Sequence, residues 1–167
     1  MSMVVSAFVT LDGVFEAPGG EYHPDGKGGW TFSAFSPELG AYKQAEAESA
    51  DSLLLGRVTY QESAPAWPEK RKHVVSTTLK EPLPWNATLI DDPAGVSGNV
   101  LVFGSGELVH SLLRRGLVDE LRLQVFPVLL GSGRKLFRDG IGVSDLELAH
   151  EQQFPNGVVA LEYRPRR

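Results

Sequence analysis

Three short segments of the sequence contain residue types that suit the binding of phosphate groups. Each follows an apolar run of strand length, and they are residues 56–59 (Gly-Arg-Val-Thr), 76–78 (Ser-Thr-Thr) and 104–106 (Gly-Ser-Gly). Glycine lets an anion approach backbone N–H groups, while hydroxyls and a guanidinium donate hydrogen bonds to phosphate oxygens. Ligands of open α/β sheets bind beyond the carboxyl ends of the strands, so we expect the three segments to hold one phosphorylated cofactor in sections.

The third segment lies inside a strand–turn–helix pattern over residues 100–116. Four apolar residues precede the glycines, and apolar residues then recur at helical spacing at positions 108, 109, 112 and 113. A helix N-terminus offers free N–H groups and a favourable dipole to a pyrophosphate. Val109 stands where the G-x-G-x-x-G fingerprint needs its third glycine, and the G-K-[ST] of a P-loop is absent. A tight turn without a ligand is the alternative interpretation.

The length, composition and charge of the chain limit the classes of protein to which it can belong. A chain of 167 residues with 42% hydrophobic and 22% charged residues is typical of one soluble globular domain, which we place over residues 1–167. The net charge of −5 argues against a nucleic-acid partner, and no apolar run approaches the length of a membrane span. The absence of cysteine excludes disulfides and is consistent with a cytoplasmic protein.

The strands and helices predicted around these segments are typical of a single α/β domain. Apolar runs predict strands over residues 3–9, 52–55, 72–76, 87–90, 100–103 and 120–126, and helices over 36–50, 59–64 and the stretch after 106. Two alternating runs, 145–148 and 158–163, flank the Asn-Gly turn signal at 155–157 and predict an antiparallel hairpin. Residues 91–99 lack a helical pattern, so the link there is a non-helical bridge or a trimmed helix.

A long irregular stretch follows the first strand and runs to Trp30. Loops of this length in compact domains are usually functional or disordered, and its apolar residues Val14, Phe15, Tyr22 and Trp30 favour an ordered flap. Its polar candidates for chemistry are Asp12, Glu16, Glu21, His23 and Asp25, and Lys27 is its single cation. A phosphorylated substrate is therefore expected to meet Lys27.

Several of these motifs together carry a family resemblance. Leu55-Gly-Arg-Val-Thr-Tyr60, Val75-Ser-Thr-Thr78, Phe103-Gly-Ser-Gly106 and Pro127-Val-Leu-Leu-Gly-Ser-Gly133 occur in the order of the dihydrofolate reductase-like fold. The chain most resembles the C-terminal reductase domain of the riboflavin-biosynthesis deaminase–reductase (RibD), in its small single-domain bacterial form. The resemblance implies a mixed, mainly parallel sheet with flanking helices and a C-terminal antiparallel hairpin.

The resemblance also implies a cofactor, NADPH, and a set of residues that bind it. Matched motif by motif, Gly56, Arg57 and Thr59 would contact the pyrophosphate and its neighbours. Ser76, Thr77 and Thr78 would hold the adenosine 2′-phosphate end. The pyrophosphate itself would be wrapped by a run of five residues, Gly104, Ser105, Gly106, Glu107 and Leu108.

For the substrate, the resemblance implies contacts from Asp12 and Trp30. In dihydrofolate reductases a carboxylate on a helix assists protonation, and Glu38 occupies the corresponding place, although it also suits the dipole of its own helix. Asp12 has a second interpretation as a turn residue that bonds its own backbone. Asp12 and Glu38 are the candidate catalytic residues.

Three functions follow from these observations. The first is an NADPH-dependent reductase of a pteridine- or pyrimidine-like heterocycle, with 5-amino-6-(5-phosphoribosylamino)uracil as the default substrate. The second is a dihydrofolate reductase, and the third is a nucleotide-binding module without catalysis. We expect no metal site, because the four histidines are scattered. We also expect a homodimer, in which the strand over 121–126 and the loop over 130–133 pair with a second copy.

Overall fold

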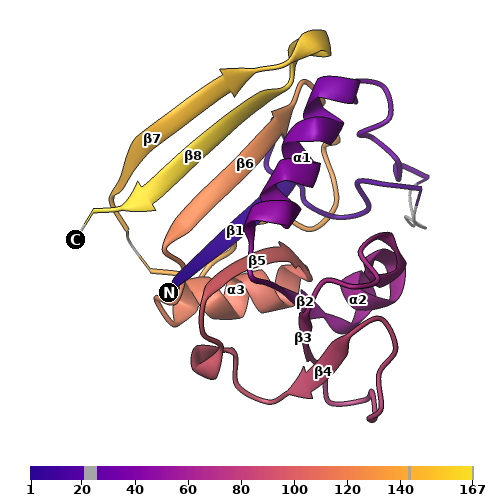
Figure 1. The fold of residues 1–167 in the computed structure, drawn as a ribbon. Helices are drawn as coiled ribbons and strands as arrows, with labels where there is room; N and C mark the ends of the chain where they lie inside the picture. The colour runs from indigo at the N-terminus through magenta and orange to yellow at the C-terminus, as the bar shows by residue number, and fades with distance from the viewer. Residues whose placement is uncertain (21–25, 143, 167) are drawn as a thin grey trace.

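The structure is a computed structural model that describes residues 1–20, 26–142 and 144–166. It is built on one 8-stranded sheet with the order β4-β3-β2-β5-β1-β6-β8-β7 (Figure 1). The strands from β4 to β6 run parallel, and β8 and β7 complete the sheet in antiparallel pairing. The mixed, mainly parallel sheet and the C-terminal antiparallel strands confirm the predicted fold class.

The elements follow the predicted order with small shifts at their ends. The strands are β1 (Ser2–Thr10), β2 (Ser52–Gly56), β3 (Lys72–Val75), β4 (Ala87–Ile90), β5 (Asn99–Gly104), β6 (Glu120–Phe126), β7 (Leu146–Gln153) and β8 (Val159–Pro165). The α-helices are α1 (Pro37–Ser49), α2 (Arg57–Ser63) and α3 (Gly106–Arg114), and short 3₁₀ turns lie at η1 (Ala64–Ala66), η2 (Pro93–Gly95) and η3 (Pro155–Gly157). No helix of the described ranges is both long and apolar enough to cross a membrane.

Helices cover both faces of the parallel part of the sheet (Figure 1). Side chains of a strand alternate between faces, and the odd-numbered residues of β1, such as Val5, pack with Leu108, Val109 and Leu112 of α3. Leu53, Leu55 and Leu101 point to the other face and pack with Ala47 of α1 and with Ala50, which caps that helix. The sheet is therefore the middle layer, and the central strands are buried on both sides.

The strand order brings the three predicted segments to one edge. Strand β2 lies between β3 and β5 and runs parallel to both, so Gly56, Val75 and Gly104 end neighbouring strands on the same side of the sheet. The segments at 56–59, 76–78 and 104–108 begin at these ends. Their convergence is what the sequence predicted.

The link between β4 and β5 is a non-helical bridge. Only the 3₁₀ turn η2 interrupts it, where the Asp92 side chain accepts a hydrogen bond from Ala94 N at 3.0 Å. The proline and glycines of this link oppose a longer helix. Of the two alternatives left open by the sequence, the bridge is therefore the one that forms.

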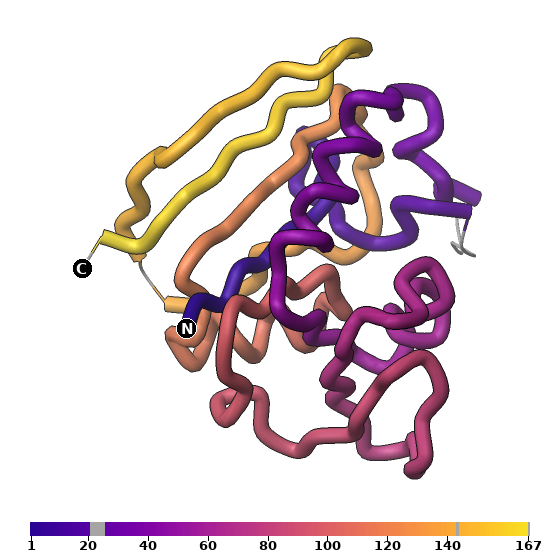
Figure 2. Tube along the Cα trace, viewed as in Figure 1, coloured from indigo at the N-terminus to yellow at the C-terminus, as the bar shows by residue number. Residues whose placement is uncertain are grey.

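Two long loops lie side by side at the carboxyl ends of β1 and β6 (Figure 2). Phe15 N donates to Arg134 O at 2.9 Å, and Leu136 N donates to Gly13 O at 3.0 Å. Val14 and Trp30 are buried, so the described part of the flap is ordered as predicted. The prediction for Tyr22 falls outside the described residues. The flap and the 127–142 loop together form one wall over the sheet edge.

Candidate active site

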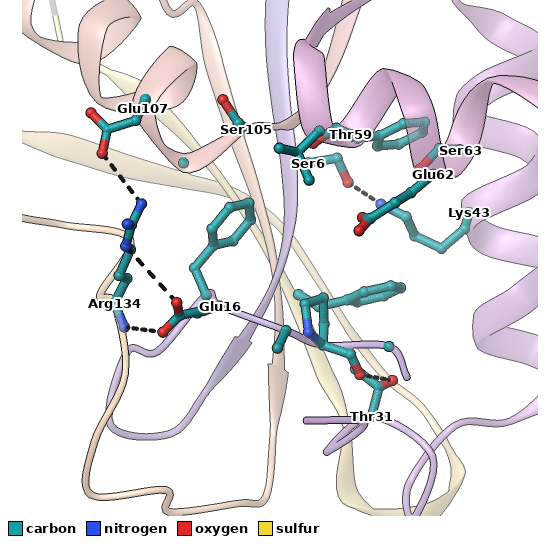
Figure 3. Close-up of a pocket in the computed structure, with 18 of the residues that line it drawn as sticks. Ser6, Glu16, Thr31, Lys43, Thr59, Glu62, Ser63, Ser105, Glu107 and Arg134 are labelled. Atoms are coloured by element: carbon teal, nitrogen blue, oxygen red, sulfur yellow. Dashed lines mark hydrogen bonds and ion pairs between the residues drawn. The ribbon is translucent and has the colours of Figure 1, made fainter. Parts of the chain in front are cut away.

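A cavity of about 750 Å³ opens beyond the carboxyl ends of the central strands. Its walls come from the sheet (Ser6, Phe8, Phe103), the flap and the segment after it (Phe15–Gly19, Thr31, Phe35), α1 (Gly40, Lys43, Gln44), the α2 region (Val58, Thr59, Glu62, Ser63, Trp67), the start of α3 (Ser105–Glu107) and the loop after β6 (Arg134, Lys135, Arg138). Such a volume suits a drug-sized or cofactor-sized ligand. Figure 3 shows the polar side chains in two groups, one around Arg134 and one around Lys43.

Glycines at the strand ends allow the elements around the cavity to approach closely. A Cβ on Gly56 would overlap the Ser105 hydroxyl and lie 2.9 Å from Ser105 N, while a Cβ on Gly104 would lie 2.9 Å from Thr59 Oγ1. Gly104 also has φ +149°, which L side chains rarely adopt. The ends of β2 and β5 are thus packed directly on one another.

The start of α3 faces the cavity. Ser105 is the N-cap, and its hydroxyl accepts from Leu108 N at 3.4 Å. The first-turn N–H groups of a helix have no partner within the helix, so this end attracts an anion. Among the predicted cofactor-binding residues, Thr59, Ser105, Gly106 and Glu107 line the cavity. Leu108 instead packs into the core behind them.

The remaining predicted cofactor residues lie along the same sheet edge, outside the cavity lining. Arg57 is exposed at the start of α2, and its guanidinium donates to Gln61 Oε1 at 3.0 Å. The Ser76 hydroxyl accepts from Thr78 N and Leu79 N, each at 3.1 Å, and closes the turn after β3. Thr77 is exposed beside them. These groups are placed to meet the part of a long ligand that projects beyond the cavity.

Asp12 joins two loops in this structure, and its predicted catalytic and substrate-binding role stays a prediction. Its carboxylate accepts from the Thr10 hydroxyl at 2.6 Å, from Gly131 N at 2.8 Å and from Leu130 N at 3.2 Å. The Thr10 hydrogen bond, followed by the backbone donor of Gly131, lowers the pKa of Asp12 to about 2. Asp12 is absent from the cavity lining and ties the flap to the 127–142 loop.

The role of Asp12 predicts a pH-dependent stability difference. Because its pKa is lowered on folding, the carboxylate stabilises the protein above its ordinary pKa of 3.8, and this contribution is lost as the pH falls through about 2. We expect Asp12→Asn to lower Tm at pH 7 and to match the wild-type Tm more closely at each step from pH 4 towards pH 2. Calorimetric scans across this range measure the difference. A Tm difference between the two proteins that does not change with pH would contradict the structural role of Asp12.

Trp30 and Glu38 are also placed away from the cavity lining. Trp30 is 6% exposed, packs edge-to-face on Phe126 and donates its indole N–H to Glu16 O at 2.9 Å, so it holds the flap, while its neighbour Thr31 faces the cavity. Glu38 is exposed in the first turn of α1. The cavity face of α1 carries Gly40, Lys43 and Gln44, which share the i, i+3, i+4 spacing of one helix face.

A group of cations at the mouth of the cavity was missed by the sequence analysis. Arg134 and Arg138 line the cavity with Lys135, and Glu107 pairs with Arg138 at 2.9 Å and with Arg134 at 3.7 Å. Arg134 also lies 3.9 Å from Glu16 (Figure 3). The ion pair with Arg138, which contributes most, lowers the pKa of Glu107. No pattern in the sequence indicates that the loop carrying these cations lies beside α3.

Lys27, which we expect to meet a substrate phosphate, contacts the 127–142 loop in this structure. Its ammonium donates to Leu130 O at 2.9 Å and to the Ser132 hydroxyl at 3.0 Å, so it braces the flap against the 127–142 loop. It is not among the cavity-lining residues. The other polar candidates of the flap, Glu21, His23 and Asp25, lie outside the described residues.

The other end of the cavity is aromatic and contains a lysine. Phe103 stacks on Trp67 with ring centroids 5.3 Å apart, and Phe8 lies on the neighbouring strand. The Lys43 ammonium sits 4.8 Å from the centre of the Phe103 ring and 5.1 Å from that of Phe8, within the range of cation–π contacts. Flat aromatic walls around a single cation suit a planar, polar ring.

The residues present fit a nucleotide cofactor such as NADPH. The glycine-packed strand ends, the Ser105 hydroxyl and the start of α3 form a cradle for phosphates, and Arg134 and Arg138 add positive charge at its rim. For metals, no group of three or more His, Cys, Asp or Glu side chains with suitable geometry occurs among the residues that the structure describes. His23 lies outside them, so the expected lack of a metal site stays a prediction.

A single mixed sheet with a glycine-packed cavity beyond its parallel strands defines the protein as one with the dihydrofolate reductase-like fold. Residues 94–160 match the model of the RibD C-terminal domain family. The C-terminal part of the chain is therefore similar to the RibD C-terminal domain family, and the whole chain shares the fold of the solved structures described below.

Two relatives come from Bacillus subtilis strain 168. The uncharacterised protein YyaP is 27% identical over 186 aligned residues, which cover 96% of this chain and 93% of YyaP. The uncharacterised protein YwjB is 27% identical over 125 residues, which cover 66% of this chain and 72% of YwjB. The similarity to YyaP extends over nearly the whole chain.

Solved structures share the fold at low sequence identity. A protein named for riboflavin biosynthesis from Shewanella sp. PV-4 has a TM-score of 0.82 and 23% identity, with 100% of both chains covered. A pyrimidine reductase-like protein from Corynebacterium diphtheriae has a TM-score of 0.72 and 13% identity, covering 99% of this chain and 92% of that one. The deaminase/uracil reductase from Thermotoga maritima has a TM-score of 0.67 and 15% identity, covering 99% of this chain and 56% of that one.

Proposed function

We propose that the protein is an NADPH-dependent reductase of a pyrimidine- or pteridine-like heterocycle. The observation that carries the proposal is that one cavity joins two different surfaces. One end has the start of α3, Ser105 and the rim cations, which suit phosphates, and the other has aromatic walls and the Lys43 ammonium, which suit a flat polar ring. The names of the Corynebacterium and Thermotoga proteins support the pyrimidine class, and 5-amino-6-(5-phosphoribosylamino)uracil is the first substrate to test.

The roles of the residues follow from their positions. Bound NADPH would supply a hydride from its nicotinamide ring. Thr59, Ser105 and the amide groups at the start of α3 would hold its phosphates, while Arg57 and the 76–78 turn would contact the part that extends along the sheet edge. Phe8, Phe103 and Trp67 would orient the reacting rings and exclude water from them, which is how a protein assists hydride transfer.

The two alternative functions make different demands on the site. A dihydrofolate reductase with Glu38 as its acid needs that carboxylate in the cavity, and its exposed position on α1 argues against this function. A nucleotide-binding module without catalysis needs only the phosphate end. The aromatic walls at the other end are unnecessary for such a module, so turnover distinguishes it from the reductase.

The test is a titration with NADPH and NADH, followed by quenching of tryptophan fluorescence. Trp67 lines the cavity, so a bound nicotinamide is expected to quench it. We then expect NADPH to be oxidised when the phosphoribosylaminouracil is added. No binding of either nucleotide would contradict the proposal, and binding without oxidation by this substrate or by dihydrofolate would favour the module.

Arg57→Ala is expected to weaken NADPH binding about fivefold, close to 1 kcal/mol. The effect is modest because Arg57 is exposed and shares its guanidinium with Gln61. Arg115→Ala is the matched control, since Arg115 caps the opposite end of α3 and pairs with Asp92. Isothermal titration calorimetry measures both variants. Equal dissociation constants for the two would exclude Arg57 from the site.

Homodimer formation remains a proposal, but its expected contact needs correction. The strand over 121–126 is internal, because β6 pairs with both β1 and β8, so it has no free edge for a second copy. The sheet edges are β4 and β7. A dimer through the sheet would therefore form along one of those strands, and sedimentation analysis tests whether it forms.

A further inference from the structure

The charged side chains around the cavity are divided between its two ends. Three cations line the cavity from the loop after β6, and they are Arg134, Lys135 and Arg138. Arg138 and Arg134 pair with Glu107 at the start of α3, at 2.9 and 3.7 Å. Figure 3 shows Arg134 and Glu107 on one side of the cavity and Lys43 and Glu62 on the other. The loop cations therefore lie at the end that suits the phosphates of a nucleotide cofactor.

Lys43 is the cation of the aromatic end, and the protein itself uses its hydrogen-bond donors. Its ammonium pairs with Glu46 Oε2 at 2.8 Å, donates to the Ser6 hydroxyl and donates to Gln124 Oε1 at 3.3 Å. An ammonium has three N–H donors, so these contacts occupy all of them. A ligand phosphate would have to break this largely buried network to reach Lys43, and breaking a buried ion pair costs free energy.

The charge of Lys43 is balanced inside the network. Glu46, whose side chain is 3% exposed, carries the opposite charge. Arg122 lies 3.4 Å from Glu46 and is absent from the cavity lining. Lys27, the cation of the flap, is held by Leu130 O and is also absent from that lining. Among the residues that the structure describes, Lys43 is therefore the single cation at the aromatic end.

Glu62 adds a negative charge at the same end. It is exposed on α2 and lines the cavity, and Figure 3 shows its carboxylate on the side of Lys43. Gln44 and Ser63 line the cavity from α1 and α2 and are neutral. Because the Lys43–Glu46 pair is neutral, this end has one negative charge in excess. A carboxylate in a partly solvated cavity repels a phosphate dianion that enters beside it.

We propose that the substrate carries a neutral substituent in place of a phosphorylated one and that Glu62 sets this preference. The proposal rests on the reductase function proposed above and narrows its substrate class to unphosphorylated pyrimidine- or pteridine-like heterocycles. Gln44 and Ser63 offer donors and acceptors that suit the hydroxyl groups of a sugar or a sugar alcohol. The phosphoribosylaminouracil then binds more weakly than its dephosphorylated counterpart and still oxidises NADPH at high concentration.

The test uses two probes that differ only in the phosphate, 6-(ribitylamino)uracil and its 5′-phosphate. Both are titrated calorimetrically at pH 7 into protein saturated with NADP⁺, which occupies the phosphate end and has no hydride to give. We expect the unphosphorylated probe to bind the wild type about threefold to tenfold more tightly, the size of repulsion between a dianion and one nearby carboxylate in water. Because salt screens exposed charges, the preference is expected to shrink at high ionic strength.

Substitutions at Glu62 test its part in the preference. Glu62→Gln is expected to bring the two dissociation constants together, and Glu62→Lys to make the phosphorylated probe the tighter ligand. Glu62 is exposed on α2, so both variants keep the core packing of the wild type. Glu151→Gln is the matched control, because Glu151 is exposed on β7 at the far edge of the sheet. It should keep the preference of the wild type.

The outcomes separate this proposal from the reductase function. Tighter or equal binding of the phosphorylated probe by the wild type, binding of neither probe, or a preference for the unphosphorylated probe that survives in Glu62→Lys would each overturn the proposal. Failure of NADP⁺ and NADPH to bind would instead count against the reductase function. That failure is seen before either probe is added, so the two cannot be confused.

Discussion

Replacing Lys72 by Met is expected to lower the free energy of unfolding by about 2–4 kcal/mol, the value of losing charge-assisted hydrogen bonds in a buried place. Lys72 is 0% exposed at the start of β3, and its ammonium donates to Trp67 O, Lys70 O and Trp85 O at 2.5, 2.7 and 2.7 Å. Methionine keeps the length and apolar stem of the side chain. It leaves the three carbonyl groups without their donor.

Urea denaturation followed by circular dichroism measures this loss as a lower midpoint at unchanged slope. Lys80→Met, on the exposed loop after β3, is the control and should change stability by less than about 0.5 kcal/mol. Trp67 is a cavity wall, so Lys72→Met should also weaken the quenching of tryptophan by NADPH. A midpoint equal to that of the control would show that the three carbonyl groups find other donors at no cost.

The arrangement of the strands could be predicted because the signals are local. Apolar runs followed by glycine or hydroxyl residues place β2, β3 and β5, and parallel pairing then puts Gly56, Ser76 and Gly104 on one edge whatever the strand order. The Asn156-Gly157 signal likewise predicts the antiparallel pairing of β7 and β8, which the structure confirms. Each of these features needs only residues that are neighbours in the sequence.

The cavity could be predicted only in part, because its charged groups meet through the tertiary structure. Arg138 contacts Glu107 and Gly106 at the start of α3, although these residues lie 31 and 32 positions away in the sequence. Arg134 comes from the same loop. Lys43 meets Ser6 and Gln124, which come from different strands. The apolar pattern of α1 is weak, so it does not indicate which face of that helix points to the cavity.

Asp12 and Lys27 illustrate that a polar residue in a glycine-rich flap has two possible roles, one in chemistry and one in structure. In this structure both fasten the flap to the loop after β6, Asp12 through N–H groups of residues 130 and 131 and Lys27 through Leu130 O. A long loop with few apolar residues needs such polar contacts to stay ordered. Their structural role is what keeps the cavity wall in place.

The network beneath α1 places buried polar and charged residues beside the candidate active site. Glu46, Gln124 and Ser6 are buried on the sheet face, where apolar residues would pack at a lower cost. Their hydrogen bonds hold Lys43, and Lys43 faces the cavity. A protein that only bound a nucleotide phosphate would gain nothing from this network, because the cradle for phosphates lies at the other end of the cavity.

A methyl group at Gly56 is expected to damage both stability and cofactor binding. The added Cβ would overlap the Ser105 hydroxyl and lie 2.8 Å from Ser105 Cβ and 2.9 Å from Ser105 N, so the ends of β2 and β5 must move apart. We expect Gly56→Ala to lower the free energy of unfolding by about 1–3 kcal/mol, as overpacking does, and to weaken NADPH at least tenfold. Gly95→Ala is the control, because a Cβ there meets nothing within 4 Å.

Adding Ser105→Gly to the Gly56→Ala variant tests whether the loss of stability comes from the contact between the new methyl group and Ser105. The Ser105→Gly change removes the hydroxyl and Cβ that the new methyl group meets, but it leaves the backbone N–H in place and removes the N-cap of α3. We therefore expect the double variant to recover part of the stability lost in Gly56→Ala, with a favourable coupling energy of about 0.5–1.5 kcal/mol in a double-mutant cycle. Additive losses would mean that the strand ends are not packed on each other, and the convergence of the phosphate-binding segments would lose its physical basis.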